Sequence, residues 1–404
     1  MTTAHFAFPY RIVTIKKMKG LKPIICVYFL TPALMLGLMT KKAFGFSPIL
    51  FLFLAFLLIQ SCNQNKKNTE ATTTQTDSSS VHFPQEKHLT NVRQLTFGGE
   101  NAEAYWSFSN SFLSFQHRDI PHGLMCDQIF TMNIADTSRK LISTGKGRTT
   151  CSFFMPGDSQ IIYASTHLHA DTCPAEPVHV RGKYLWPIYG EYEIFIADLK
   201  GNIVKQLTNN KFYDAEATVS PKGDKIIFTS DRSGDLELYT MNLDGSNVKQ
   251  ITNSLGYDGG ACFSPNGKQI IWRASHFDTD SERTEYKDNL KKHLVSPMKM
   301  ELFIANADGS NRKQLTTLGG ANWAPCFSPD GKKIIFSTNH KTKAIPFNLY
   351  SINTDGTNLE QITFDKVFDA FAMFSYDGKK LAWCSNRNNG GTRETNIFVA
   401  DWKE

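Results

Sequence analysis

The chain has 404 residues, of which 41% are hydrophobic and 20% are charged, and its formal net charge is +6. This composition is typical of a globular protein and excludes a disordered one. Residues 1–61 hold seven Lys and Arg but no Asp or Glu, so residues 62–404 carry 37 basic and 38 acidic residues. A body with a net charge of −1 lacks the basic surface of a nucleic-acid-binding protein.

Residues 43–59 form an apolar run that follows Lys41 and Lys42 and ends in Leu58-Ile59-Gln60-Ser61-Cys62. Basic residues, an apolar core and small residues follow one another in this order in a secretory signal. The last five residues resemble the lipobox of bacterial lipoproteins, which implies that Cys62 is lipidated and becomes the new N-terminus. The alternative is a transmembrane anchor, for which 17 apolar residues are few.

The segments around this signal complete a targeting region. Met39 directly precedes the signal, so we interpret residues 1–38 as an over-extended start, with a genuine second hydrophobic segment at residues 24–38 as the alternative. Residues 62–87 are polar and of low complexity, which predicts a flexible tether. Together they predict a lipid-anchored protein of the bacterial cell envelope, facing the periplasm or the outer membrane.

A repeated unit fills the rest of the chain, and its clearest copy reads TVSPKGDKIIFTSDR followed by LELYTMNLDGSNVKQIT. Copies of the unit cover residues 107–143, 153–208, 218–252, 262–316, 326–363 and 373–402. Each copy predicts four antiparallel strands, named a to d here, with a Ser-Pro-x-Gly turn between a and b and a two-residue Asp-Gly hairpin between c and d. Four-stranded units repeated at about 45–60 residues predict propeller blades.

The sixth unit contains strands a, b and c but no strand d before residue 404. Residues 92–96 read VRQLT and match the d strands VKQIT and RKQLT, so we expect this N-terminal strand to complete the sixth blade. Such closure removes the exposed sheet edges. The predicted fold is therefore all-β: a six-bladed β-propeller of four-stranded antiparallel blades over residues 88–404, closed by an N-terminal strand.

The pattern SPDGK, SDR, LY, DG and LT resembles the WD-repeat-like propeller of TolB and of the N-terminal halves of some prolyl-type peptidases. The resemblance covers about 310 residues and its motifs are specific for the fold. It implies a TolB-like β-propeller lipoprotein. Because this family includes scaffolds, binding modules and enzyme accessory domains, the resemblance says little about activity.

Alignment of the six units places two columns of polar residues at one face of the disc. The b strands end in Arg118, His167, Arg232, His276, His340 and Arg387, and the a strands open with Glu103, Thr149, Asp214, Asp258, Asn322 and Asp369. We expect the two residues of each blade to form a pair, either as structural ties between strand ends or as a polar channel mouth that binds an ion or a polar ligand. The three histidines lie in blades that are not all neighbours, so no metal site is assigned.

The loops between strands b and c emerge at the same face, which marks it as the expected working face. In blade two this loop covers residues 168–191, where Tyr184, Trp186 and Tyr189 are candidates to line a groove, with packing onto the blade as the alternative. The potential metal ligands of this insert have irregular spacing that favours an ordinary loop; they are His169, Asp171, Cys173, Glu176 and His179.

The insert of blade four covers residues 277–299, and SERTEYKDNLKKHL within it predicts a short helix capped by Asp280 or Ser281. Outside the targeting region the cysteines are Cys126, Cys151, Cys173, Cys262, Cys326 and Cys384. None forms a C-x-x-C pair, which argues against a zinc ribbon. An even number in an exported protein permits disulfides, whereas the last three lie in strands and are expected to be buried free thiols.

No nucleophile elbow, H-E-x-x-H motif or P-loop is present in the sequence. The predicted function is therefore binding: a lipid-anchored, exported, monomeric, TolB-like propeller that takes a protein or cell-envelope ligand through the b–c loop face, without catalysis, cofactor or nucleic acid. The alternative is a metal-dependent polysaccharide lyase. Oligogalacturonate lyases resemble the chain in blade pattern and use histidines to hold a divalent metal.

Overall fold

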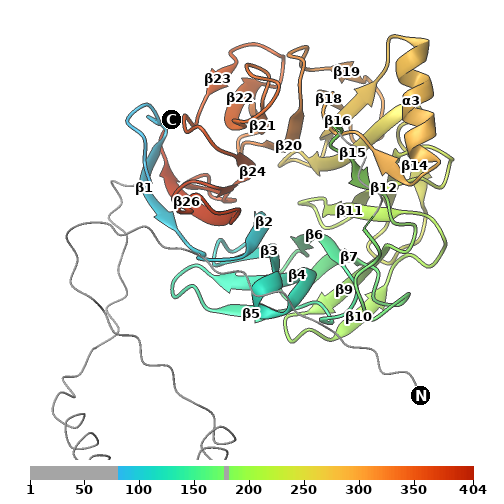
Figure 1. Cartoon of the computed structure of the whole chain (residues 1–404), viewed down its shortest axis with the longest axis horizontal. Helices are drawn as coiled ribbons and strands as arrows, with labels where there is room; N and C mark the ends of the chain where they lie inside the picture. Colours follow the sequence, from blue (N-terminus) through green and yellow to red (C-terminus); the bar gives the residue numbers. More distant parts are fainter. Residues whose placement is uncertain (1–80, 177–181) are drawn as a thin grey trace, which may run out of the picture. The chain divides into compact units, whose positions relative to one another are not determined.

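Six sheets of four antiparallel strands surround a common axis in residues 81–176 and 182–404, the part of the chain that the computed structural model describes (Figure 1). Cys62, the apolar run 43–59 and His179 lie outside the described residues. Within them, no helix is long and apolar enough to cross a membrane. The all-β six-bladed propeller predicted from the repeats is confirmed.

Each sheet is one blade, whose strands follow the order a, b, c and d from the axis outward (Figure 1). The blades are β2 (Glu100–Trp106), β3 (Phe112–Asp119), β4 (Leu124–Asn133) and β5 (Arg139–Leu141); β6 (Thr149–Phe154), β7 (Gln160–Ser165), β9 (Glu193–Asp198) and β10 (Ile203–Gln206); β11 (Asp214–Val219), β12 (Ile226–Ser230), β13 (Glu237–Met241) and β14 (Lys249–Gln250); β15 (Gly256–Phe263), β16 (Gln269–His276), β18 (Glu301–Asn306) and β19 (Lys313–Gln314); β20 (Asn322–Phe327), β21 (Lys333–Thr338), β22 (Asn348–Asn353) and β23 (Glu360–Gln361); and β24 (Asp369–Phe374), β25 (Lys380–Ser385), β26 (Asn396–Trp402) and β1 (Leu89–Gln94).

The N-terminal strand β1 closes the ring as predicted. It pairs antiparallel with β26, from Leu89 opposite Trp402 to Gln94 opposite Phe398. The chain is already packed before this strand, because Val81 and Glu86 are buried. Residues 81–87, which the sequence assigned to the tether, therefore lie against the sixth blade.

A buried hydroxyl explains why each unit ends in Leu or Ile followed by Thr or Ser. In each blade the Thr or Ser after strand d accepts a hydrogen bond from a backbone N–H of strand c. The donor and acceptor pairs are Ile397 and Thr96, Ile129 and Ser143, Ile194 and Thr208, Leu238 and Thr252, Leu302 and Thr316, and Leu349 and Thr363. An unpaired buried N–H costs about 1–3 kcal/mol, so this bond fixes the position of strand d.

The Asp-Gly hairpins are one residue longer than predicted. In blade three the backbone N–H of Asn242 donates to the carbonyl of Ser246 at 2.9 Å, which leaves residues 243–245 as a three-residue loop. Gly245 has φ +82° and takes the left-handed position that ends such a loop. The Asp244 carboxylate accepts from the Ser246 backbone N–H at 3.0 Å and fixes the turn.

Every a strand contains a β-bulge, where the register with strand b shifts. The bulge residue has a positive φ in all six blades; the residues are Glu103, Cys151, Glu216, Gly260, Ala324 and Phe371. All six line cavities on the propeller axis. A bulge re-aims one side chain out of the strand pattern, and here it presents one residue of each blade to the axis.

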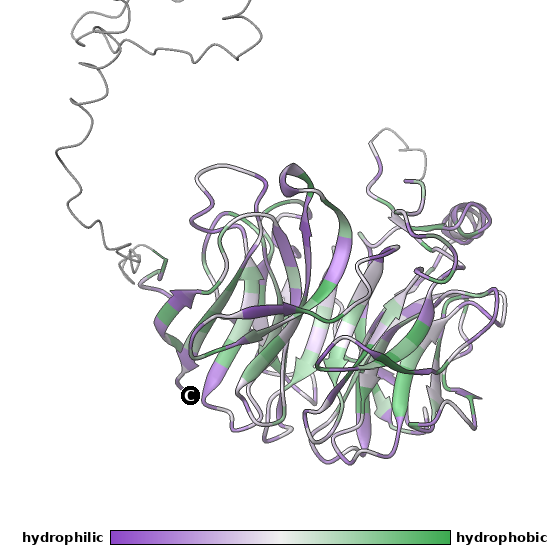
Figure 2. Cartoon of the chain, turned by 90° about the horizontal axis from the view of Figure 1, so that it is seen from below, coloured by the Kyte–Doolittle hydropathy of each residue, from purple (hydrophilic) through white to green (hydrophobic). Residues whose placement is uncertain are grey.

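The inserts of blades two and four join each other on one face of the disc, where the helix of blade four stands away from the blades (Figure 2). Strand β8 (Trp186–Pro187) pairs with β17 (Leu294–Val295). The predicted helix is α3 (Asp280–Leu290), but its N-cap is Thr279 rather than Asp280 or Ser281. Thr279 forms a capping box with Glu282, so the helix begins one residue earlier than the composition alone indicated.

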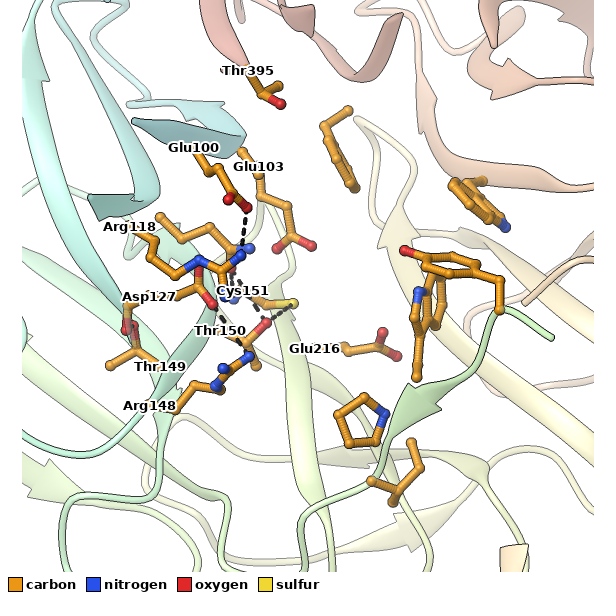
Figure 3. Close-up of a pocket in the computed structure, with 18 of the residues that line it drawn as sticks. Glu100, Glu103, Arg118, Asp127, Arg148, Thr149, Thr150, Cys151, Glu216 and Thr395 are labelled. Carbon is orange, nitrogen blue, oxygen red and sulfur yellow. Dashed lines mark hydrogen bonds and ion pairs between the residues drawn. The ribbon is translucent and has the colours of Figure 1, made fainter. Parts of the chain in front are cut away.

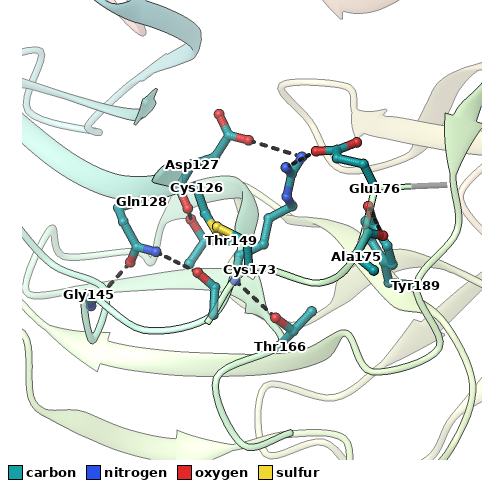
Figure 4. Close-up of a disulfide and its surroundings, with 12 residues drawn as sticks. Cys126, Asp127, Gln128, Gly145, Thr149, Thr166, Cys173, Ala175, Glu176 and Tyr189 are labelled. Atoms are coloured by element: carbon teal, nitrogen blue, oxygen red, sulfur yellow. Dashed lines mark hydrogen bonds and ion pairs between the residues drawn. A yellow bond between two sulfur atoms is a disulfide. The ribbon is translucent and has the colours of Figure 1, made fainter. Parts of the chain in front are cut away.

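A disulfide between Cys126 and Cys173 ties the blade two insert to β4 of blade one (Figure 4). Its Cα atoms are 5.8 Å apart. Cys173 is therefore a structural residue, as the loop interpretation of this insert requires. Cys262, Cys326 and Cys384 are free thiols as expected, although only Cys384 is fully buried.

Candidate functional site

A cavity of about 720 Å³ opens at the face where the a strands begin and the inserts attach (Figure 3). Blades one and two supply a polar wall, and the blade two insert and blades four to six supply an apolar, mainly aromatic wall. Volumes of about 300–1,000 Å³ are typical of small-ligand pockets. A smaller cavity of about 50 Å³ lies further along the axis.

Two arginines of the polar wall are held by carboxylates (Figure 3). Arg118 Nη2 lies 2.6 Å from Glu100 Oε2. Arg148 lies 3.5 Å from Asp127 Oδ2 and 2.6 Å from Glu176 Oε1. Burial raises the pKa of the Asp127 carboxyl, and the neighbouring Arg148 guanidinium counteracts this rise.

The floor of the cavity contains an ion pair embedded in hydrogen bonds. Arg273 of β16 donates to Glu216 of β11 and, at 2.8 Å, to the Tyr257 hydroxyl. Glu216 Oε2 also accepts from the Tyr257 hydroxyl at 2.6 Å, from Thr229 Oγ1 at 2.7 Å and from the Gly260 backbone N–H at 2.9 Å. These bonds satisfy the Glu216 carboxylate and fix the Arg273 guanidinium beneath the Trp186 ring, 5.4 Å from its centroid.

Glu103 lies beside this ion pair but is not part of it. Its Oε2 atom is buried and accepts no hydrogen bond from any residue that the structure describes. Burial raises the pKa of the Glu103 carboxyl to about 7, although a hydrogen bond with the Cys151 thiol and the charge of Arg273 counteract part of the rise. Burial also raises the pKa of the adjacent Cys151 thiol well above its ordinary value, so this thiol is neutral near pH 7.

The opposite wall is a continuous series of aromatic contacts from the rim to the floor. Trp186 of the insert contacts Trp323 at a centroid distance of 5.3 Å, and Trp323 stacks on Phe347 at 4.4 Å. Phe347 contacts Phe368 at 5.5 Å, and Phe368 contacts Phe371 at 6.2 Å. Aromatic faces of this kind offer apolar surface and a negative quadrupole.

Three of the six expected strand-end pairs form as aligned. Arg232 lies 2.7 Å from Asp214, His276 lies 3.1 Å from Asp258, and Arg387 lies 3.0 Å from Asp369. None of these six residues lines the large cavity. These pairs tie strand ends at the edge of the site.

The other three expected pairs are absent. Arg118 pairs with Glu100 rather than Glu103, because Glu103 is the bulge residue of its strand and the residue equivalent to the other strand openings is Asn101. His167 Nδ1 contacts Ser165 Oγ at 2.9 Å instead of Thr149. His340 Nδ1 contacts Thr338 Oγ1 at 3.3 Å, whereas Asn322 donates to the Met300 carbonyl at 2.7 Å.

The imidazoles do not converge. Burial lowers the pKa of His167 and of His340, which favours the neutral ring near pH 7. Within residues 81–176 and 182–404, no group of three His, Cys, Asp or Glu side chains is arranged to hold a metal ion. Of the residues singled out from the sequence, the cavity is lined by Glu103, Arg118, Thr149, Cys151, Tyr184, Trp186 and Tyr189.

Sequence reasoning missed Arg148, Asp127, Glu216, Arg273 and Tyr257 as site residues. One sequence signal could have revealed Arg273: it is the one charged residue at its position in the six b strands. The equivalent residues of the other b strands are Gln116, Ala164, Thr229, Ser337 and Cys384. A charged residue on an inner strand of one blade needs a partner, and the bulge residue Glu216 of the preceding blade provides it.

Comparisons with known proteins agree with this fold. Residues 188–294 match the family model of the TolB beta propeller domain. A solved structure of TolB from Acinetobacter baumannii is 18% identical and superposes with a TM-score of 0.50, covering 67% of this chain and 56% of that one. A putative TolB from Agrobacterium tumefaciens is 16% identical, with 76% and 91% coverage and a TM-score of 0.49.

An oligogalacturonate lyase from Vibrio parahaemolyticus is 12% identical, with 77% and 80% coverage and a TM-score of 0.49. No curated protein matches the chain. The TolB-like propeller architecture predicted from the repeats is thus confirmed at the level of the fold.

Proposed function

We propose that this TolB-like propeller is exported to the bacterial cell envelope, anchored there by lipid at Cys62, and binds a protein or envelope ligand in the cavity at its b–c loop face. The observation that carries the proposal is the aromatic-walled cavity on the face that both inserts build up. Propellers use such loop faces as working surfaces because loop variation does not disturb the blades.

The rim of the cavity has the character of a binding surface. Tyr184 is 57% exposed and Ile345 is 69% exposed, and both line the cavity. Trp186, which also lines the cavity, is held in place by the β8–β17 pairing, and Lys183 Nζ lies 2.6 Å from Glu285 Oε1 of α3. Exposed aromatic residues on a rigid support are typical anchors of binding interfaces.

Export is supported by two independent features. The apolar run 43–59 has the layout of a secretory signal. The disulfide between Cys126 and Cys173 belongs to a class of bond that persists in oxidising compartments such as the periplasm. The same disulfide fastens the insert that carries the aromatic rim.

Site-specific photo-crosslinking in intact cells tests the binding face. A benzophenone amino acid at Tyr184 is expected to give a discrete adduct, and the same group at Lys332 is expected to give none. Lys332 is a matched control because it is exposed and lies in an a–b turn, at the opposite end of the strands. The Trp186→Ala change is expected to reduce the adduct at least fivefold. Equal adducts at both positions, or adducts at residue 332 alone, contradict the proposal.

The Cys62→Ala change tests the anchor. Without the thiol no lipid can be attached, so we expect an unprocessed precursor or soluble protein in place of a mature membrane-associated form. Metabolic labelling with palmitate followed by membrane fractionation measures both results. Mature, membrane-bound protein from the Cys62→Ala variant contradicts lipid anchoring.

A further inference from the structure

The charges that line the cavity do not balance. Among the described residues of its lining, each of the three arginines has a carboxylate partner: Glu100 for Arg118, Asp127 for Arg148 and Glu216 for Arg273. Glu103 is the remaining carboxylate, and it has no ion-pair partner. When Glu103 is ionised, the cavity therefore holds one negative charge in excess.

Glu103 lies where the two cavities on the propeller axis meet. It lines both the large cavity and the smaller one beyond it, and its carboxyl group is directed into the open space between the two walls (Figure 3). The ionisable groups that surround it are Asp127 of β4, Cys151 of β6, Glu216 of β11, Arg273 of β16 and Tyr105 of its own strand. Arg273 is the one cation in this set, and it is engaged by Glu216.

The aromatic wall ends at the same point. Phe371, the last ring of the series, lines both cavities together with Glu103. Aromatic faces attract cations, and the attraction is stronger where the cation is desolvated. A ligand that reaches Glu103 from the rim therefore passes an apolar, cation-attracting surface before it meets a carboxylate that has no cation beside it among the described residues.

We propose that the cavity binds its ligand through a protonated amine, which pairs with the Glu103 carboxylate while the apolar body of the ligand lies against Phe371 and the aromatic wall. This inference rests on the proposed function, because it names the chemistry of the ligand for the same cavity. A divalent cation needs several converging ligands, which the described residues do not offer. An anionic ligand meets the unpaired charge of Glu103 and is repelled.

Calorimetry on the mature, detergent-solubilised protein tests the proposal with three probes: phenethylamine, Nα-acetyl-lysine amide and the neutral analogue 2-phenylethanol. We expect at least one amine to bind at least tenfold more tightly than the alcohol at pH 8. Tighter binding of phenethylamine assigns the site to a free amine, and tighter binding of the lysine amide assigns it to a lysine side chain. An alcohol that binds as well as both amines overturns the proposal.

The pH dependence has a definite sign. Both amines remain protonated below pH 9, whereas the Glu103 carboxyl, with its pKa raised to about 7, must lose its proton before it can pair. Amine affinity is therefore expected to rise about tenfold from pH 6 to pH 8, with proton release measurable in buffers of different ionisation enthalpy. An affinity that stays constant or falls over this range contradicts the role of Glu103.

The Glu103→Gln change keeps the shape of the side chain and removes its charge. We expect it to weaken amine binding at least tenfold and to abolish the pH dependence. Glu191→Gln is the matched control: it makes the same change of net charge at a residue outside the cavity lining, and it is expected to leave the affinity unchanged. The comparison of amine and alcohol on the unmodified protein decides the question even if Glu103→Gln does not fold.

Failure of the amine probes with persistent crosslinking at Tyr184 overturns this inference alone, and loss of crosslinking overturns the proposed function.

Discussion

The Arg387→Ala change is expected to destabilise the propeller more than any other single change at a strand end. Arg387 Nη2 lies 2.9 Å from Glu86 and 3.0 Å from Asp369, and its Nε donates to Asp365 at 3.0 Å. All four side chains are at most 3% exposed. Removing the guanidinium leaves three buried carboxyl groups without a cation, which costs about 3–5 kcal/mol. Thermal denaturation is expected to show a loss of at least about 5 °C, or no folded protein.

Arg118→Ala is the matched control, because it removes the same side chain from the b strand end of another blade. Arg118 and Glu100 have side chains that are 22% and 45% exposed, so water replaces the lost partner and the cost is about 0–1 kcal/mol. Equal melting temperatures for the two variants contradict the account of Arg387 as a buried cation with three partners.

Acidic pH affects the same group. Burial, and then the charge of Asp369, raises the pKa of Asp365 to about 7. Because the pKa of Asp365 is higher in the folded chain than in the unfolded chain, its protonation stabilises the folded state at low pH. This stabilisation is lost as the pH rises from the unfolded pKa to the folded pKa. Near neutral pH the Asp365 carboxyl is therefore only partly ionised, and removal of Arg387 is expected to cost more at pH 8, where Asp365 is charged, than at pH 5.

Most of the fold could be predicted from the sequence because the same turn-forming residues recur in each repeated unit. Ser-Pro-x-Gly, Asp-Gly and Leu-Thr each mark a fixed point of a blade, and VRQLT at residues 92–96 carries the mark of a fourth strand outside its own unit. These signals are local, and closure of the ring then follows from the removal of open sheet edges.

The site could be predicted only in part, because it depends on contacts between blades. The bulge in each a strand moves one residue toward the axis, and nothing in the pattern around Glu103 marks it as a bulge rather than a strand opening. Glu216 and Arg273 lie 57 residues apart and meet only when blades three and four pack together. The β8–β17 pairing joins two irregular inserts that show no common periodicity. The residues that line the cavity are brought together by the packing of one blade against another, and the sequence of a single repeat does not reveal these contacts.

A chain that begins at residue 97 is expected to lose the closed ring, whereas a chain that begins at residue 80 is expected to keep it. The shorter chain lacks β1 and leaves the outer edge of β26 unpaired, and it exposes the surface that Leu89, Val92 and Leu95 cover. Burial of such side chains contributes about 1.5–3 kcal/mol each, and the loss of Glu86 weakens the Arg387 cluster at the same time. For the chain that begins at residue 97 we expect aggregation, or a melting temperature lower by at least about 10 °C. Size-exclusion chromatography and thermal denaturation measure the two results. A synthetic peptide of residues 86–97 added in trans is expected to restore part of the stability, because it can pair with the free edge of β26. If the two chains melt at the same temperature and both remain monodisperse, β1 does not hold the ring closed.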